Sequence, residues 1–238
     1  MAQEALARTS SAAITPKARM ETLRSLLEAA KPSMSQVVPK HVTPERLVKL
    51  ALVAASRTPL LLSCEPRSIV QGVMTAAQLG LDCGGVLGSA YLVPFKNSKQ
   101  GGRYEAQLIV GYRGLVELAR RSGEIKTIEA HVVYAHDLFE IAYGLDPVLR
   151  HVPCLTGDAG DPILVYAIAR LKDGGRQVEV MGRSEIERIR SRSRAGSSGP
   201  WVTDWAEMAR KTVVRRLCKY LPLSPELADA LVADEKVE

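Results

Sequence analysis

Alternate residues from 188 to 194 are arginines, and this pattern has the clearest chemical meaning in the sequence. The four are Arg188, Arg190, Arg192 and Arg194. Acids precede the run at Glu185 and Glu187, but none follows until Asp204, whereas a solvated surface normally mixes both signs. Guanidinium groups match phosphate oxygens in a forked geometry. The run therefore indicates that its counter-charge is supplied from outside the chain, by a phosphate-bearing polyanion or an anionic membrane surface.

The net positive charge of the chain is concentrated around this run. Residues 183–220 contain ten basic and four acidic side chains, a net charge of +6 that equals the net charge of the whole chain. The chain has 32 basic and 26 acidic residues, so the remainder has 22 of each and is neutral. Such a local excess is typical of a surface that binds a polyanion or an anionic membrane. The sequence has neither a lipidation signal nor the run of about 20 apolar residues that a membrane span needs, which favours the polyanion.

A helix predicted over residues 204–221 has a cationic face. The stripe consists of Lys211, Arg215, Arg216 and Lys219. The opposite face carries Ala206, Val213, Val214, Leu217 and Leu221. We expect the apolar face to pack in the core and the stripe to point outward. Arg210 projects towards the apolar side, so it needs a buried acidic partner or a contact with another subunit. Trp201 has two equal interpretations, a platform on which a base stacks or a side chain that packs the helix onto a sheet.

Other chemistries leave weaker traces. The segment GLDCGGVLG precedes a strand instead of opening a helix, and no phosphate-loop or serine-triad motif occurs. His151 and Cys154 have no second ligand pair at zinc spacing. Glu124 and Lys126 form an E-x-K triplet downstream of Asp82, so a magnesium-dependent nuclease stays an alternative, although exposed charges explain the triplet better. We predict no catalytic residues, no metal and no cofactor.

The elements that must position these residues alternate between helices and hairpins. Thr43 and Pro44 open one helix, and a second is predicted from Ser63 to Gly80. A polar loop carrying Lys96, Lys99 and Arg103 joins two strands, and a short helix ending at Gly123 follows. Further strands are predicted at KTIEAHVVYA and DLFEIAYG, and ILVYAIARL pairs with RQVEVMG across the turn at 173–175.

Capping signals place the last helices. Ser184 with Glu187 opens a helix through the arginine run, Asp204 with Glu207 opens the cationic helix, and a short terminal helix begins at Ser224. Together the elements predict an α+β fold with a central, largely antiparallel sheet of hairpins, packed by helices on the N- and C-terminal sides. We expect residues 1–40 to be a flexible tail without an export signal, 41–225 to be a single domain, and 226–238 to be a short C-terminal helix or tail.

Three blocks, taken together and in this order, resemble the RecT family of phage-type single-strand annealing proteins. They are LGLDCGGVLGSAYLVPFKN, QLIVGYRGLVELARRSGEI and SGPWVTDWAEMARKTVVRRLCKYLPLSPEL, and the resemblance covers roughly residues 40 to 230. It implies ATP-independent binding of single-stranded DNA and pairing of complementary strands through an annealed duplex intermediate. It also implies homo-oligomers in the form of rings or helical filaments, and no enzymatic activity.

The resemblance also implies a biological setting and a set of DNA contacts. The setting is recombination encoded by a phage or prophage, in the cytoplasm of a bacterial host, beside an exonuclease that makes 3′ overhangs. A contact with the host single-strand binding protein is in doubt because the tail after Pro225 is short. Beside the magnesium-dependent nuclease, a sequence-specific DNA-binding regulator is the second alternative function. The implied contacts are Lys211, Arg215, Arg216 and Lys219 along a DNA groove, Arg188, Arg192 and Arg194 as its second wall, and Lys96, Lys99, Arg103, Arg113 and Trp201.

Overall fold

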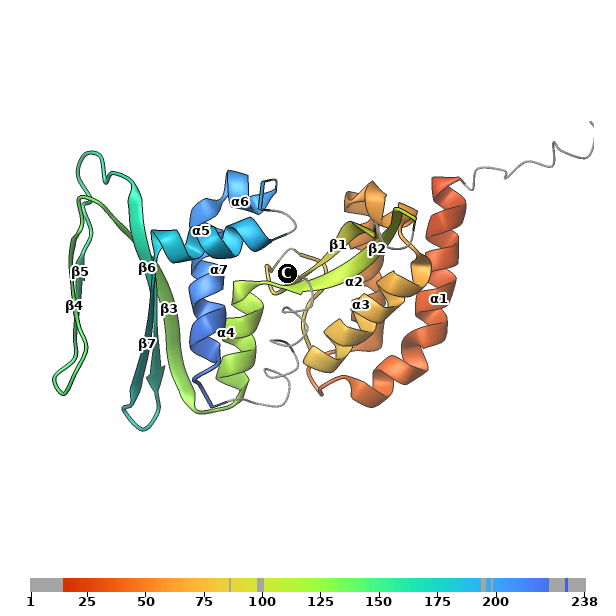
Figure 1. Cartoon of the computed structure of the whole chain (residues 1–238). Coiled ribbons are helices and arrows are strands. Elements are labelled where there is room, and N and C mark those ends of the chain that lie inside the picture. The colour runs from red at the N-terminus through yellow and green to blue at the C-terminus, as the bar shows by residue number, and fades with distance from the viewer. Residues whose placement is uncertain are drawn as a thin grey trace, which may run out of the picture. The chain divides into compact units, whose positions relative to one another are not determined.

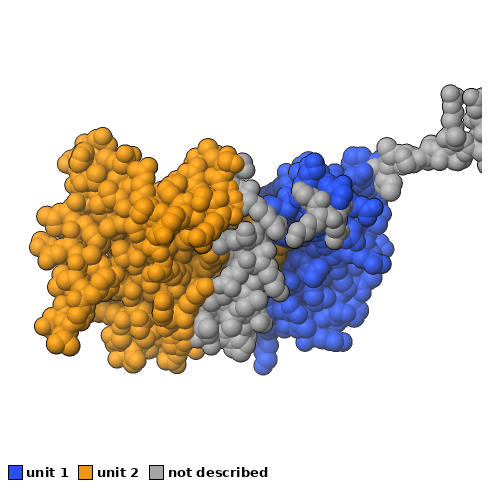
Figure 2. Space-filling model, viewed as in Figure 1, with its two compact units in different colours: residues 1–84, 92–107 blue, residues 85–91, 108–238 orange. Residues whose placement is uncertain are grey.

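The structure is a computed structural model that describes residues 15–85, 87–97, 101–193, 196–197, 199–222 and 230. The chain forms two compact units where the sequence predicted a single domain (Figure 2). Unit 1 comprises residues 1–84 and 92–107, and unit 2 comprises 85–91 and 108–238. The predicted terminal helix from Ser224 and the tail over 226–238 lie outside the described residues, apart from the buried Ala230.

Unit 1 is built mainly from helices. They are α1 (Pro16–Val37), α2 (Pro44–Arg57), the 3₁₀-helix η1 (Pro59–Ser63) and α3 (Pro66–Leu79) (Figure 1). The prediction of a flexible tail was wrong for residues 16–37, because α1 packs against α2 and α3 and buries Leu23, Leu27 and Met34. These three side chains recur at helical spacing and therefore share one face of α1. Residues 1–14 lie outside the described part of the chain.

The helix boundaries in unit 1 follow local chemistry. The Thr43 hydroxyl accepts a hydrogen bond from the Arg46 amide, and Pro44 takes the first helical position of α2, as predicted. Gly80 ends α3 in the left-handed conformation with φ of 61°, which glycine adopts without steric cost. The prediction that Ser63 caps this helix was wrong: Ser63 belongs to η1, and α3 begins at Pro66.

A predicted hairpin is confirmed after α3. Strands β1 (Ala90–Asn97) and β2 (Arg103–Val110) form a two-stranded sheet. Residues 98–100 of its loop, including Lys99, lie outside the described residues. Ala106 donates its amide hydrogen to the Ser68 hydroxyl at 2.8 Å, which ties β2 to α3.

Unit 2 contains the remaining strands in two sheets. Strands β3 (Ile125–Tyr134), β6 (Pro162–Leu171) and β7 (Arg176–Gly182) form an antiparallel sheet in the order β3-β6-β7. Strands β4 (Leu138–Ala142) and β5 (Val148–Val152) form an antiparallel hairpin of their own. The α+β class is thus confirmed, but small sheets replace the one central sheet. Strand β5, which is five residues long, was missed in the sequence.

Helices complete unit 2. They are α4 (Tyr112–Arg121), α5 (Arg183–Arg192), α6 (Pro200–Thr203) and α7 (Trp205–Cys218). Helix α7 contacts all three strands of the larger sheet, and the β4–β5 hairpin lies beyond the other face (Figure 1). The central strand β6 is covered on both faces, since Val165 and Ala167 point towards the helices while Tyr166 meets Phe139 of the hairpin. This double covering explains the unbroken apolar run ILVYAIA.

Both predicted capping signals in unit 2 were wrong in detail. Helix α5 begins at Arg183 with Gly182 at the cap, and no side chain of the described residues caps it. Glu187 instead accepts a hydrogen bond from the Trp205 indole at 2.7 Å. Helix α7 begins at Trp205, and the Asp204 side chain accepts from the Thr203 hydroxyl instead of capping the helix.

Candidate nucleic-acid interface

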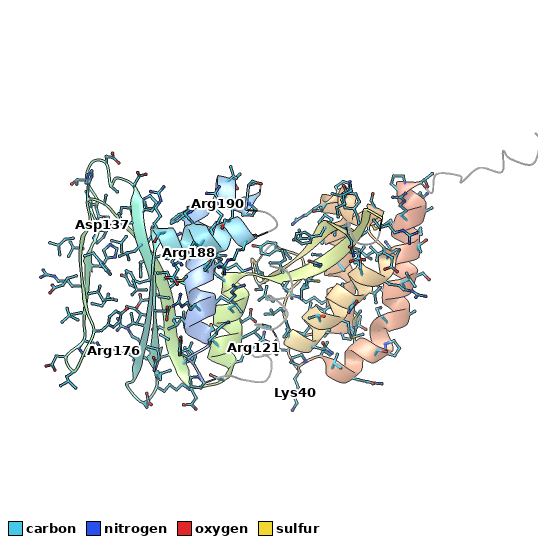
Figure 3. All side chains as sticks on the ribbon, viewed as in Figure 1. Lys40, Arg121, Asp137, Arg176, Arg188 and Arg190 are labelled. Atoms are coloured by element: carbon cyan, nitrogen blue, oxygen red, sulfur yellow. The ribbon has the colours of Figure 1, made fainter. Side chains whose placement is uncertain are left out.

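Helix α5 sorts the arginine run into two groups. Arg188 and Arg192 are one helical turn apart and exposed, and neither forms an ion pair within the described part of the chain. Arg190 projects from a different side of α5 and is half-buried (Figure 3). Its Nε donates to the Gly196 carbonyl at 2.8 Å, and its guanidinium lies 3.4 Å from Glu187. Arg188 and Arg192 therefore face solvent as predicted, whereas Arg190 holds the chain after α5. Arg194 lies outside the described residues.

Arg216 of α7 is occupied inside unit 2. Its Nε lies 2.8 Å from the Glu179 carboxylate of β7, and its guanidinium also bonds Glu185 of α5. Burial raises the pKa of the Glu179 carboxyl above its usual range, although the Arg216 charge opposes that rise. The hydrogen bond to Glu185 raises the pKa of the guanidinium in turn. These contacts join α7 to β7 and α5, which is a structural role that the predicted stripe did not anticipate.

The rest of the predicted stripe is less exposed than expected. Lys211 and Arg215 are half-buried on α7. Both of these residues, and Lys219 as well, have a contact partner. Lys219 is exposed but follows the last residue of α7. Leu217 and Val213 are buried on the apolar side, as predicted. Arg210 bonds Glu207 on the same helix at 2.5 Å, but the Glu207 side chain is 53 % exposed, so this is not the buried acidic partner that the sequence predicted.

The two tryptophans serve packing. Trp201 of α6 is only 3 % exposed, so its ring offers no face to a base in this conformation. Trp205 is half-buried and is fixed by its bond to Glu187. Of the two interpretations of Trp201, packing is the one that agrees with its burial, and its assignment as a DNA contact is withdrawn.

The isolated H-x-x-C pair belongs to a buried polar network. Asp137 has a side chain 2 % exposed; its carboxylate accepts from the amides of Tyr134 and Cys154, both at 2.7 Å, and lies 3.0 Å from His151 Nε2. His151 Nδ1 is 3.1 Å from the Tyr166 hydroxyl. Burial alone would raise the pKa of the Asp137 carboxyl, but the two amides and His151 together lower it. The network fastens the base of the β4–β5 hairpin to β6.

Asp82 and Glu124, the acidic residues of the nuclease alternative, have ordinary structural surroundings. Asp82 accepts the Gly84 amide at 2.7 Å and lies 3.6 Å from Arg46, both contacts within unit 1. Glu124 is an exposed residue before β3 in unit 2. Over the described ranges, no three or more histidine, cysteine, aspartate or glutamate side chains are grouped closely enough to hold a metal ion. No helix among the described residues is long and apolar enough to cross a membrane.

Comparison with known proteins identifies the family. The model of the RecT family matches residues 45–238. Protein RecT of Escherichia coli K12 is 48 % identical over 208 residues, which cover 87 % of this chain and 77 % of that protein. The chain belongs to the RecT family. An uncharacterized Bacillus subtilis 168 protein, YqaK, is 28 % identical over 180 residues, covering 74 % of this chain and 59 % of its own length.

Arg113 and Tyr91 are two neighbouring side chains that form a further candidate DNA contact. The sequence analysis predicted only Arg113. Arg113 at the start of α4 is exposed, and its Cδ comes within 3.3 Å of the point where a Cβ on Gly88 would lie. The Tyr91 hydroxyl comes within 3.2 Å of the same point, and Tyr91 is 41 % exposed. An exposed aromatic ring beside an arginine can stack on a base and meet its phosphate. The signal for Tyr91 was its outward position between the buried Ala90 and Leu92.

Two glycines, Gly111 and Gly114, allow the start of α4 to pack closely against residues 88–89. A Cβ on Gly111 would lie 2.1 Å from the Gly88 carbonyl oxygen, and a Cβ on Gly114 would lie 2.2 Å from that of Ser89. Only glycine therefore allows the beginning of α4 to pack on residues 88–89. The contact positions Arg113 next to Tyr91. In unit 1, Lys96 and Arg103 are exposed on β1 and β2, as predicted.

Proposed function

We propose that this RecT-family protein binds single-stranded DNA and pairs complementary strands without ATP, acting as a homo-oligomer and not as an enzyme. The observation that carries the proposal is the exposure of Arg188 and Arg192, which have no ion-pair partner in the described part of the chain. They lie in the segment that holds the whole net charge of the protein. A surface cation without an internal acid attracts phosphate at little desolvation cost.

The proposed DNA contacts come from both units. In unit 2 they are Arg188, Arg192, Arg194, Arg113, Tyr91 and the basic residues Lys211, Arg215 and Lys219; in unit 1 they are Lys96, Lys99 and Arg103. Arg216 ranks below these because Glu179 and Glu185 already balance its charge. Phosphate contacts carry no sequence information, so we expect little preference among sequences.

The proposed setting is recombination encoded by a phage or prophage in the cytoplasm of a bacterial host. An exonuclease would supply single strands with 3′ ends, and a contact with the host single-strand binding protein is a further proposal. The protein would need no cofactor, because pairing of bases supplies the free energy of annealing. The alternatives are a magnesium-dependent nuclease and a regulator that recognises one duplex site.

A single annealing assay separates these functions. Two labelled complementary oligonucleotides are incubated with the protein and Mg²⁺, with no nucleotide added. We expect faster pairing than without protein, intact strands, and an affinity whose logarithm falls linearly with log salt, by about 0.7 per phosphate contacted. Cutting that disappears in Asp82→Ala or Glu124→Ala would establish the nuclease instead. Tight binding to one duplex sequence that salt does not weaken would establish the regulator.

A further inference from the structure

A groove of about 300 Å³ lies in unit 2 between α4, β3 and α7. Its floor is apolar and is formed by Val116, Ile128, Ala130 and Val214. The first three of these side chains are only half-buried, so the floor is open to solvent. Concave apolar surface with a polar rim is typical of a site where a ligand or another protein binds. The groove is therefore a candidate docking surface.

Arg210 lies at the rim of this groove and has donors to spare. The sequence predicted for it either a buried acid or a contact with another subunit, and the acid that it bonds, Glu207, is exposed. A guanidinium has five N–H donors, and one carboxylate uses at most two of them. Glu129, the other acid at the rim, lies 3.6 Å from Arg170, which balances its charge. Arg210 can therefore bind a second carboxylate that enters the groove.

The tip of the β4–β5 hairpin has the chemistry that complements the groove. The tip comprises residues 143–147, with the sequence YGLDP, between the paired Ala142 and Val148. Tyr143 is 73 % exposed and Leu145 is 101 % exposed. Asp146 is exposed as well and forms no ion pair with any residue in the described part of the chain. The tip thus presents two apolar side chains and one carboxylate.

The hairpin that carries this tip is held in a fixed position. Asp137 precedes β4 and Cys154 follows β5, and the bond from the Cys154 amide to the Asp137 carboxylate closes the base of the hairpin. On the inner face, the ring centroids of Phe139 and His151 lie 5.6 Å from that of Tyr166 on β6. The strands that project the tip are therefore preformed, and a partner need not order them on binding.

The tip and the groove lie on opposite faces of the β3-β6-β7 sheet. Helices α4 and α7, which form two sides of the groove, pack on one face, and the β4–β5 hairpin lies beyond the other (Figure 1). Because the sheet separates them, the tip of a chain does not reach the groove of the same chain. A tip that fills a groove must come from another copy.

We propose that the tip of one copy enters the groove of the next copy, with Leu145 on the apolar floor and Asp146 bound to Arg210. The inference deepens the proposed function and rests on it for its purpose, because a homo-oligomeric annealer requires a contact between copies. The pairing itself is inferred from the shape of the groove and the complementary chemistry of the tip.

A contact between tip and groove is heterologous, because it joins two different surfaces of the chain. Each copy has one tip and one groove, so a row of copies keeps a free tip at one end and a free groove at the other. Such a contact gives a ring if the rotation between neighbours closes and a helical filament if it does not. Both assemblies are among those that the proposed function includes.

The size of the tip fits a contact that is weak by itself. Residues 143–147 are far fewer than the roughly 20 residues on each side of a stable interface. Tyr143 adds contact area beside Leu145, and tyrosine is enriched among the residues that supply most binding energy. Copies bound to one DNA strand are held at high local concentration, which strengthens such a contact. We therefore expect association at high protein concentration without DNA and at lower concentration with it.

Two variants that break the two sides of the contact separately give the test. Leu145→Glu places a charge against the apolar floor, and Arg210→Glu removes the cation and repels Asp146. The matched controls are Leu155→Glu, an 87 % exposed leucine beyond the base of the hairpin, and Arg67→Glu, an exposed arginine of α3 in unit 1. Sedimentation of the full-length proteins without DNA measures their masses at a concentration where the wild type is associated. Circular dichroism confirms that each variant is folded.

We expect Leu145→Glu and Arg210→Glu each to sediment as single copies, while both controls associate as the wild type does. An equimolar mixture of the first two variants should form pairs of copies and no longer assembly. The Arg210→Glu copy keeps a normal tip and the Leu145→Glu copy keeps a normal groove, so one contact forms and the row then ends. Neither a symmetric contact nor loss of folding produces this result.

Wild-type masses for either variant would overturn the proposal, as would a mixture that stays as single copies or forms assemblies longer than two. A wild type that remains a single copy at every protein concentration would overturn it too. Because DNA is absent from this experiment, the masses decide the interface whether or not the wild type anneals. The annealing assay decides the function separately.

Discussion

Helices α5 and α7 have similar basic compositions, but their charges meet different surroundings. The exposed Arg188 and Arg192 of α5 have no ion-pair partner in the described residues. On α7, Arg210 bonds Glu207 and Arg216 bonds both Glu179 and Glu185. One of those acids, Glu185, belongs to α5 itself, so α5 neutralises Arg216 of α7 while presenting its own Arg188 and Arg192 to solvent.

This difference separates two uses of arginine. A guanidinium between two carboxylates fixes the position of a helix and has little attraction left for phosphate. A guanidinium without an acid contributes little to folding and keeps its full charge for a ligand. The contrast predicts that changing Arg216 on α7 reduces stability and that changing Arg188 and Arg192 on α5 reduces DNA binding.

The largest expected effect concerns the apolar face of α7. Leu217 is 1 % exposed, in the helix that contacts β3, β6 and β7. Leu217→Ala should lower the free energy of unfolding by roughly 2–5 kcal/mol, because it removes buried methyl groups and leaves a cavity. Leu87→Ala removes the same atoms from a side chain that is 53 % exposed and is the control. Denaturant melts measure both, and equal melts would show that α7 is not anchored by this face.

A smaller loss of stability is expected for Arg216→Ala. The change leaves the Glu179 carboxylate, whose side chain is 14 % exposed, without its cation. We expect the free energy of unfolding to fall by about 1–3 kcal/mol at neutral pH, because a buried charged group without its partner is no longer compensated for its lost hydration. Arg176→Ala, on the exposed side of β7, should cost within about 0.5 kcal/mol.

The loss of stability in Arg216→Ala should depend on pH. The pKa of Glu179 is already raised in the folded protein, so its protonated form favours folding, and this contribution is lost as the pH rises through the folded pKa. Removing Arg216 raises that pKa further. The deficit of the variant should therefore be largest at neutral pH and should narrow as the pH falls towards the ordinary glutamate value of about 4.3. A deficit that does not change with pH would contradict the role given to Arg216.

Local patterns predicted much of this fold, and distant contacts account for the errors. The period of α7 placed Val213 and Leu217 in the core, and glycine signals placed the end of α3 and the β6–β7 turn correctly. Helix α1 was missed because an Ala- and Ser-rich stretch precedes it and Pro32 lies inside it, although Leu23 and Leu27 had helical spacing. Its burial depends on α2 and α3, which sequence periodicity does not place.

The sequence predicted the positive charge of the candidate site but did not predict how its side chains are arranged. Concentration of the net charge in residues 183–220 could be counted directly. The partners of Arg216 could not, because Glu185 is 31 residues away and Glu179 lies on another strand. Trp201 had two interpretations until its burial was known. A helical wheel assigns directions around one helix, but it does not show what the neighbouring elements place there.

The smallest expected effect on stability, and the most direct test of the comparison, is the double change of Arg188 and Arg192 to alanine. Both side chains are exposed on α5, so unfolding should change by no more than about 0.5 kcal/mol. Single-strand affinity should nevertheless fall, and the slope of log affinity against log salt should become shallower by about 0.7 for each phosphate that the variant no longer binds.

The matched control for this change is Arg216→Ala, because it also removes an arginine from the basic segment. At a pH and temperature where both variants are fully folded, we expect Arg216→Ala to keep nearly the wild-type salt slope. Filter binding over a salt series measures all three proteins. If Arg216→Ala reduces the slope while the α5 double variant leaves it unchanged, then the internally paired arginine is the one that meets DNA. The ion pairs of Arg216 would then have to open on binding, since its two carboxylates and a phosphate would compete for the same donors.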